Sequence, residues 1–118
     1  MDDDKIVVYH NPRCSKSRET MSILEDNNKS VEVIEYLKQP PDRQTLEDII
    51  AKLSLSPRDL IRTGEQAFQD AGFNIDSMSD SDIIEAICAH PMLLQRPIVV
   101  CGNKAVIGRP PTKILDII

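Results

Sequence analysis

Short apolar segments rich in β-branched residues occur in two pairs, one near each end of the chain, and a long helical stretch separates the pairs. The first pair comprises residues 5–9 and residues 31–36. Between them, residues 14–24 have the spacing of an amphipathic helix, and Asn27-Asn28 ends that pattern. A strand, a helix and a second strand in so short a span predict a βαβ unit whose strands are parallel.

The second pair of segments, residues 97–101 and 104–108, is joined by Gly102-Asn103, which is a hairpin turn signal. These segments are therefore expected to form antiparallel strands. Two prolines then open a last expected helix at residues 112–118. The order βαβ followed by ββα is the connectivity of a thioredoxin-like α/β fold, with the helical stretch inserted between its two halves.

The insert spans about residues 43–91 and is expected to contain about four helices. Its first helix is marked by apolar residues at i, i+3, i+4 and i+7, starting at Leu46. Ser56, followed by a proline, and Ser79, followed three residues later by Asp82, are typical helix N-caps. We find no internal repeat or linker, so residues 1–118 are interpreted as a single thioredoxin-like domain that carries a helical insert.

The net charge of −5 and the 118-residue length exclude several classes of protein. A general nucleic-acid binder would need a basic surface, so no nucleic-acid partner is expected. No apolar run approaches the roughly 20 residues that span a bilayer, so no membrane association is expected. The acidic Met1–Lys5 segment lacks the basic and apolar regions of a secretory signal. A monomer is expected.

The three cysteines, Cys14, Cys88 and Cys101, are an odd number at no metal-ligand spacing. A disulfide framework and a metal site are therefore not expected, and a reducing cytoplasmic location fits better. Cys88 lies in an apolar-rich helical pattern and Cys101 ends a strand, so both are interpreted as packing residues.

Cys14 differs because it lies where a strand ends and a helix begins. Free backbone N–H groups and the helix dipole favour an anion at that position. The dipole typically contributes about 0.3–1 kcal/mol, which is too little to make a thiol mostly ionised at pH 7. Nearby cations are therefore expected to contribute, and Arg13, Lys16, Arg18 and His10 are close in sequence. The same groups would hold a tetrahedral oxyanion beside the sulfur.

Spacing excludes two classes of thiol enzyme. Protein phosphatases with a cysteine-phosphate loop place Arg six positions after Cys, where this chain has Thr20. Dithiol oxidoreductases need C-x-x-C, where this chain has Ser17. Cys14 therefore has no resolving thiol in its own turn, and an oxidised or modified sulfur there is expected to need an external thiol.

The segment His10-Asn11-Pro12-Arg13-Cys14-Ser15-Lys16-Ser17-Arg18 resembles the H-N-P-x-C-x-x-S-R motif of the glutaredoxin-coupled arsenate reductases (ArsC-like), especially their short, chromosomally encoded branch. Further matches to the family follow in order along nearly the whole chain. They are Tyr36-Leu37 with Pro40-Pro41, Leu60-Ile61-Arg62, His90-Pro91, Arg96-Pro97-Ile98-Val99-Val100 and Gly108-Arg109-Pro110.

The resemblance implies a thioredoxin-like fold with a helical insert, in agreement with the pattern of strands and helices. It also implies that Cys14 is the nucleophile and that His10 helps its ionisation. Arg62, Arg96 and Arg109 are implied to bind arsenate and to stabilise its adduct, and are expected to converge on the Cys14 sulfur. The residues implied to bind substrate are Cys14, Ser15, Lys16, Ser17, Arg18, Arg62, Arg96 and Arg109.

The activity that the resemblance implies is arsenate reduction to arsenite, with glutathione as co-substrate, glutaredoxin as partner and no bound metal or cofactor. The peptide bond before Pro97 is expected to be cis, as it usually is in this fold. The chain departs from the best-understood family members at Ser15-Lys16, where those proteins have Gly-Thr. The lysine adds a positive charge at the oxyanion loop.

Two other functions remain open at this point. Spx-type transcription regulators share the fold and bind RNA polymerase, but they typically carry a C-x-x-C switch at this turn, and Ser17 argues against that class. A general glutathione-dependent thiol oxidoreductase would need Cys14 but not the three arginines.

Overall fold

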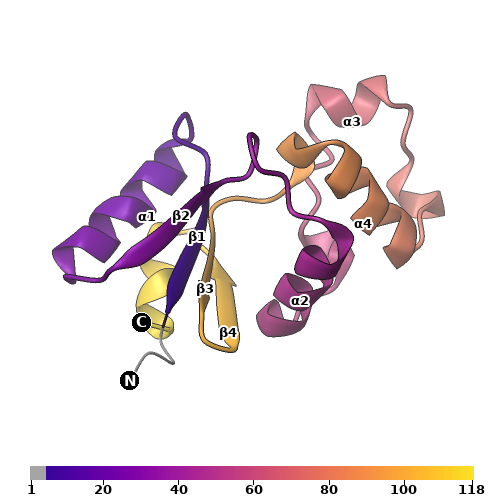
Figure 1. Cartoon of the computed structure of the whole chain (residues 1–118). Helices are drawn as coiled ribbons and strands as arrows, with labels where there is room; N and C mark the ends of the chain where they lie inside the picture. The colour runs from indigo at the N-terminus through magenta and orange to yellow at the C-terminus, as the bar shows by residue number, and fades with distance from the viewer. Residues whose placement is uncertain (1–4) are drawn as a thin grey trace. The chain divides into compact units, whose positions relative to one another are not determined.

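The chain forms two compact units in a computed structural model that describes residues 5–118. Unit 1 comprises the described residues up to Gln39 together with Arg96–Ile118, and unit 2 is Pro40–Gln95. Unit 1 therefore contains the first and the last described segments of the chain, drawn in indigo and yellow in Figure 1. The helical insert predicted at about 43–91 lies within unit 2. That the insert and the rest of the chain form one single domain stays a prediction.

A four-stranded sheet forms the centre of unit 1, in the order β2-β1-β3-β4. The strands are β1 (Ile6–His10), β2 (Val31–Glu35), β3 (Ile98–Cys101) and β4 (Lys104–Ile107). Strand β1 pairs with β2 in parallel and with β3 antiparallel, and β3 pairs with β4 antiparallel. The predicted strands are each found within one residue of their expected ends. The thioredoxin-like fold class, with helices inserted between the two halves, is confirmed.

Helix α1 (Ser15–Asp26) connects β1 to β2, and a 3-10 helix, η5 (Pro111–Asp116), follows β4. The two helices pack against each other and share an apolar cluster with the sheet (Figure 1). Alternate residues of the two central strands face this cluster, because successive side chains of a strand point to opposite sides. Its buried members are Ile6, Val8, Leu24, Val99, Cys101 and Ile114.

The last helix differs from its prediction, which was a helix over residues 112–118. It is a 3-10 helix that starts at Pro111 and ends at Asp116. Hydrogen bonds there run between residues three apart, as from the Lys113 N–H to the Pro110 carbonyl. So short a segment opened by two prolines leaves too few N–H groups for a stable α-helical ladder.

Two peptide bonds in unit 1 are cis, Arg96–Pro97 and Arg109–Pro110. The first confirms the expectation for Pro97, and the second was not predicted. The β3–β4 turn is the expected Gly102-Asn103, and Gly102 has a φ of 62°, a conformation that glycine adopts at no steric cost.

Unit 2 contains three α-helices, α2 (Arg43–Leu53), α3 (Gln66–Asp70) and α4 (Asp80–Ala89). The helix expected to open at Ser56 is a single 3-10 turn, η2 (Pro57–Asp59). It ends early because Leu60 and Gln95 are joined by a backbone hydrogen bond, which draws the following residues into an extended bridge. Further single turns, η3 and η4, cover Ile75–Ser77 and Pro91–Leu93.

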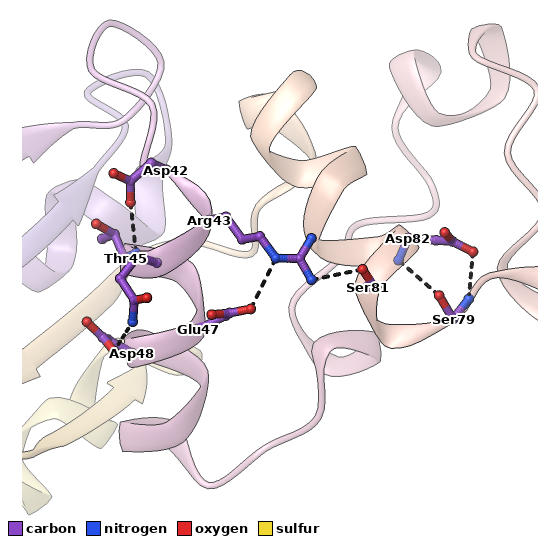
Figure 2. Close-up of polar contacts among 9 residues, drawn as sticks. Asp42, Arg43, Thr45, Glu47, Asp48, Ser79, Ser81 and Asp82 are labelled. Carbon is purple, nitrogen blue, oxygen red and sulfur yellow. Dashed lines mark hydrogen bonds and ion pairs between the residues drawn. The ribbon is translucent and has the colours of Figure 1, made fainter.

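Side-chain caps mark where α2 and α4 of unit 2 begin (Figure 2). The Asp42 carboxylate accepts from the Thr45 N–H at 2.8 Å, and Ser79 and Asp82 form the expected reciprocal capping box of α4. Arg43 joins α2 to α4, because its guanidinium donates to Glu47 in its own helix and to the Ser81 hydroxyl at 2.8 Å.

Gly108 directly follows β4 and lies close to Pro97, which precedes β3, and to Thr20 of α1. Its N–H donates to the Pro97 carbonyl at 2.8 Å. A Cβ at this position would lie 2.9 Å from Pro97 Cγ and 2.9 Å from the hydroxyl oxygen of Thr20, which is fully buried in α1. Neither group is the free end of a flexible side chain, so a methyl group has no room.

We therefore expect Gly108→Ala to lower the free energy of unfolding by about 1–3 kcal/mol through overpacking. The matched control is Gly64→Ala, because a Cβ at Gly64 meets nothing within 4 Å. That control should change stability by no more than about 0.5 kcal/mol. Urea titrations followed by circular dichroism measure both, and equal effects of the two changes would contradict the steric argument.

Candidate active site

The turn between β1 and α1 positions Cys14 at the start of a helix. Cys14 is the N-cap of α1, with extended backbone angles of −94° and 124°, and its N–H donates to the Asn11 carbonyl at 3.0 Å. Its carbonyl accepts the first helical hydrogen bond from the Arg18 N–H. The sulfur is half-buried, so it remains accessible from solvent.

Asn11 shapes this turn through three hydrogen bonds. Besides accepting from Cys14, it accepts the Arg13 N–H on its side-chain oxygen at 3.0 Å, and its own N–H donates to the Ser17 hydroxyl at 3.3 Å. Asn11 and Ser17 are both buried. The side chains of the H-N-P-x-C-x-x-S motif therefore hold the turn closed and fix the position of the thiol.

The surroundings of Cys14 favour the thiolate. Burial of the sulfur by itself raises the pKa of Cys14. The backbone N–H of Ser17, the guanidinium of Arg96 and the backbone N–H of Lys16 outweigh burial, so the pKa lies below its ordinary value. The predicted contribution of the helix start is therefore present in the structure, and the main cation is Arg96 rather than a sequence neighbour.

Arg96 and Arg109 both lie beside Cys14, as two of the three arginines were expected to. The Arg109 guanidinium is 3.9 Å from the Cys14 sulfur through Nη2, and its Nε donates to the Arg96 carbonyl at 2.7 Å. Both arginines are partly buried, and Arg96 Nε has no hydrogen-bond partner. Two guanidinium groups next to one thiolate form a site for an anion with several oxygens.

The remaining residues of the motif lie in the first turn of α1. Ser15, Lys16 and Arg18 are exposed. The Lys16 ammonium is 3.8 Å from the Glu19 carboxylate, and Arg18 donates to the Pro12 carbonyl at 3.1 Å. The Lys16 and Arg18 side chains therefore have partners on the protein. The backbone N–H groups of Ser15, Lys16 and Ser17 precede the first helical hydrogen bond and can donate to an anion.

His10 ends β1 and pairs in register with Glu35 of β2. Burial lowers the pKa of His10 below its ordinary value, the Glu35 carboxylate opposes this effect, and the Arg18 charge adds to it. His10 is therefore neutral at pH 7, and its Nδ1 has no hydrogen-bond partner. A neutral imidazole can accept a proton but adds no positive charge. The expected help of His10 with the ionisation of Cys14 stays a prediction. A neutral His10 could help only by accepting a proton.

Sequence reasoning assigned no role to Tyr36, although it was noted as part of a matched motif. Tyr36 is fully buried in unit 1, and its hydroxyl has no hydrogen-bond partner of good geometry. Burial raises its pKa, whereas the nearby Arg96 and Asn11 side chains lower it and the Cys14 charge raises it further. The signal available in the sequence was a tyrosine at the end of a segment that was expected to pair with the strand before the cysteine.

Arg62 belongs to unit 2. Its N–H donates to the Leu93 carbonyl at 2.7 Å, next to the bridge between Ile61 and Leu94. Its guanidinium lies 3.3 Å from the Glu65 carboxylate and borders a mostly polar cavity of about 310 Å³. The expectation that Arg62 joins the other two arginines at Cys14 stays a prediction.

The other cysteines lie elsewhere in the fold. Cys88 is half-buried in α4 of unit 2, and Cys101 is buried in the apolar cluster of unit 1. No disulfide bond joins any of the three cysteines. Across residues 5–118, no three His, Cys, Asp or Glu side chains gather in a way that could hold a metal ion. The helices in this part of the chain are too short or too polar to cross a membrane.

A strand, a tight turn and a helix that starts at one accessible thiol define a thioredoxin-like protein with one candidate nucleophile at the start of its first helix. Comparison with known proteins makes this more specific. The model of the ArsC family matches residues 9–117, so the chain belongs to the ArsC family.

Relatives match over nearly the full length. "Uncharacterized protein YfgD" of Escherichia coli K12 is 43% identical over 97% of both chains. "Arsenate reductase" of Neisseria meningitidis serogroup A is 42% identical over 90% of this chain and 92% of its own. The solved structure of an arsenate reductase from Vibrio cholerae is 38% identical, covers 98% of each chain and superposes with a TM-score of 0.93.

The surroundings of the two half-buried cysteines shift their pKa values in opposite directions. The pKa of Cys14 is lowered, whereas burial raises the pKa of Cys88, with Arg43 opposing this effect and Asp42 and Glu85 adding to it. The rate of alkylation by iodoacetamide follows the thiolate fraction, so its midpoint pH should be lower for Cys14 than for Cys88. Mass spectrometry of the two peptides measures both rates in one sample.

Arg96→Gln tests whether the Arg96 guanidinium lowers the pKa of Cys14, because this substitution removes the guanidinium and keeps a side chain of similar length. The midpoint of Cys14 should rise and that of Cys88 should stay the same. In the unsubstituted protein, a Cys14 midpoint at or above about 8.5, the ordinary value of a free thiol, would contradict the assignment of Cys14 as an activated nucleophile.

Proposed function

We propose that this chain is an arsenate reductase in which the Cys14 thiolate attacks arsenate, and glutathione and glutaredoxin supply the electrons. The observation that carries the proposal is the pair of guanidinium groups, Arg96 and Arg109, beside a thiol whose pKa is lowered. Membership of the ArsC family and relatives that bear the name arsenate reductase support it.

In the proposed complex, the oxyanion lies between Cys14 and the two arginines. Each guanidinium offers parallel N–H donors that match two oxygens of a tetrahedral anion. The N–H groups of the first turn of α1, from Ser15 to Ser17, add donors and the positive end of the helix dipole. Arg62 is proposed as the third arginine. These groups also stabilise the charge that develops as the sulfur attacks.

The first half of the reaction forms two sulfur–arsenic bonds without changing the oxidation state. The Cys14 thiolate attacks arsenic(V), an S–As bond forms, and one oxygen leaves as water after protonation. The thiolate of glutathione then displaces a second oxygen, which also leaves as water. Arsenic remains at +5 and carries both sulfurs.

The second half moves the electrons. The thiolate of glutaredoxin attacks the glutathione sulfur, and the As–S bond to glutathione breaks with its electron pair left on arsenic. Arsenic is thereby reduced to +3, and glutaredoxin and glutathione form a mixed disulfide. Water displaces Cys14 from arsenic(III), which releases arsenite and restores the thiol. A second glutathione reduces the mixed disulfide and yields glutathione disulfide.

This scheme places the chain in a reducing compartment. Three cysteines without a disulfide bond favour the cytoplasm, where glutathione is abundant. The scheme needs no bound metal or cofactor and no second copy of the chain, so we propose that a monomer is active.

A coupled assay with arsenate, glutathione, glutaredoxin, glutathione reductase and NADPH tests the proposal through arsenate-dependent NADPH oxidation. Omission of glutaredoxin tests the proposed partner separately. Turnover of a simple disulfide without any effect of arsenate would favour the general thiol oxidoreductase. An inactive protein that binds RNA polymerase would favour the regulator.

Cys14→Ser should abolish arsenate reduction, because a hydroxyl at this site is not ionised at neutral pH and forms no stable bond to arsenic. The double variant Cys88→Ala with Cys101→Ala should keep most of the activity, since the resolving thiol is external. Circular dichroism establishes that each variant is folded. Loss of turnover in a folded double variant would show that an internal thiol takes part.

Arg96→Lys and Arg109→Lys should each reduce arsenate-dependent kcat/KM by an amount equivalent to about 1.5–3 kcal/mol, the range for hydrogen bonds to charged groups. A lysine keeps the charge but cannot offer two parallel donors. The matched control is Arg43→Lys, because Arg43 binds Glu47 and Ser81 in unit 2. If all three substitutions had the same small effect, the arginines would not bind the oxyanion through paired donors.

A further inference from the structure

The ends of three neighbouring strands meet beside the Cys14 turn. In the parallel pair of β1 and β2, His10 is opposite Glu35, so the next residues, Asn11 and Tyr36, leave the sheet side by side. In the antiparallel pair of β1 and β3, Tyr9 is opposite Ile98, so Arg96 precedes β3 at this same edge. Asn11, Tyr36 and Arg96 therefore come together from three separate segments of unit 1.

Two of these residues have buried polar atoms whose needs are complementary. The Tyr36 hydroxyl and the Arg96 Nε are both inaccessible to solvent, and neither has a hydrogen-bond partner of good geometry. An isolated buried polar group costs free energy. The Nε–H group can only donate, and a phenol oxygen can accept. The Arg96 and Asn11 side chains both lie near enough to the Tyr36 hydroxyl to affect its titration, although burial has the largest effect on its pKa and raises it.

We propose that Tyr36 is a positioning residue, whose phenol oxygen accepts from Arg96 and holds that guanidinium against the Cys14 sulfur. One hydrogen bond from the Arg96 Nε–H to the phenol oxygen would satisfy both buried atoms at once. This inference concerns the same site as the proposed function. Of its tests, only the measurement of kcat/KM depends on the protein being an arsenate reductase.

The choice of a phenol as the acceptor has a physical reason. A carboxylate at this position would bind Arg96 more strongly but would also neutralise its charge. A neutral phenol orients the guanidinium and leaves its charge to act on the thiolate and on an incoming anion. Because Tyr36 is fully buried and its pKa is raised, it stays protonated and uncharged at neutral pH.

Tyr36→Phe tests this role, because it removes one oxygen and keeps the ring in the core. The alkylation midpoint of Cys14 should rise, since Arg96 is no longer held beside the sulfur, and that of Cys88 should stay the same. Arsenate-dependent kcat/KM should fall about tenfold, as for the loss of one hydrogen bond that orders a charged group. The variant should stay folded, because the phenylalanine ring keeps the packing of Tyr36 in the core.

A double-mutant cycle with Arg96→Gln separates positioning from other roles. If Tyr36 acts through Arg96, adding Tyr36→Phe to Arg96→Gln should shift the Cys14 midpoint no further. A control for general destabilisation is Ile114→Val in the core cluster of unit 1. It should lower the melting temperature and leave the Cys14 midpoint unchanged.

An unchanged Cys14 midpoint in folded Tyr36→Phe would overturn the proposal, and so would a full additional shift in the Arg96→Gln background. Alkylation needs no arsenate. A protein that fails to reduce arsenate but shows the expected non-additive midpoints would therefore lose the proposed function and keep this inference.

Discussion

The active-site turn depends on the pairing of β1 with two strands at once. Strand β1 is bound to β2 on one side and to β3 on the other, so the chain segments that leave these three strands are brought to one edge of the sheet. That edge holds the start of α1 and, with it, Cys14. Arg96 precedes β3, and Arg109, which follows β4, donates to the Arg96 carbonyl at 2.7 Å. The backbone pairing of the sheet therefore decides which charges surround the thiol.

Those charges act against the cost of burial. Burial of a sulfur raises its pKa, and this effect is the largest one at Cys88. At Cys14 the N–H groups at the helix start and the guanidinium of Arg96 reverse the direction. The same groups that favour the thiolate are arranged to receive an anion with several oxygens, so one set of donors serves both activation and binding. A phenol next to Arg96 adds order to this arrangement without adding charge of its own.

Close packing connects the site to the stability of unit 1. Gly108 binds the Pro97 carbonyl and leaves no room for a methyl group between Pro97 and Thr20, and it is the residue directly before Arg109. The position of Arg109 near Cys14 thus follows from a backbone approach that only glycine permits. Unit 2 has its own caps and core, and there the Arg62 guanidinium pairs with Glu65 beside a polar cavity.

The sequence by itself determined most of the local elements and pointed to Cys14 as the candidate nucleophile. Apolar periodicity gave the four strands and α1 within two residues, and the lone cysteine at a strand-to-helix turn needed only local rules of helix ends and charge. Local rules predict a helix after Ser56 and another at residues 112–118 but do not give the type of hydrogen bonding, and both segments, η2 and η5, are 3-10 helices. The cation that acts on Cys14 could not be found from sequence neighbours, because Lys16 and Arg18 have partners on the protein and Arg96 comes from the far end of the chain. Only strand pairing, which joins residues distant in sequence, decided that Arg96, Arg109 and Tyr36 surround the thiol.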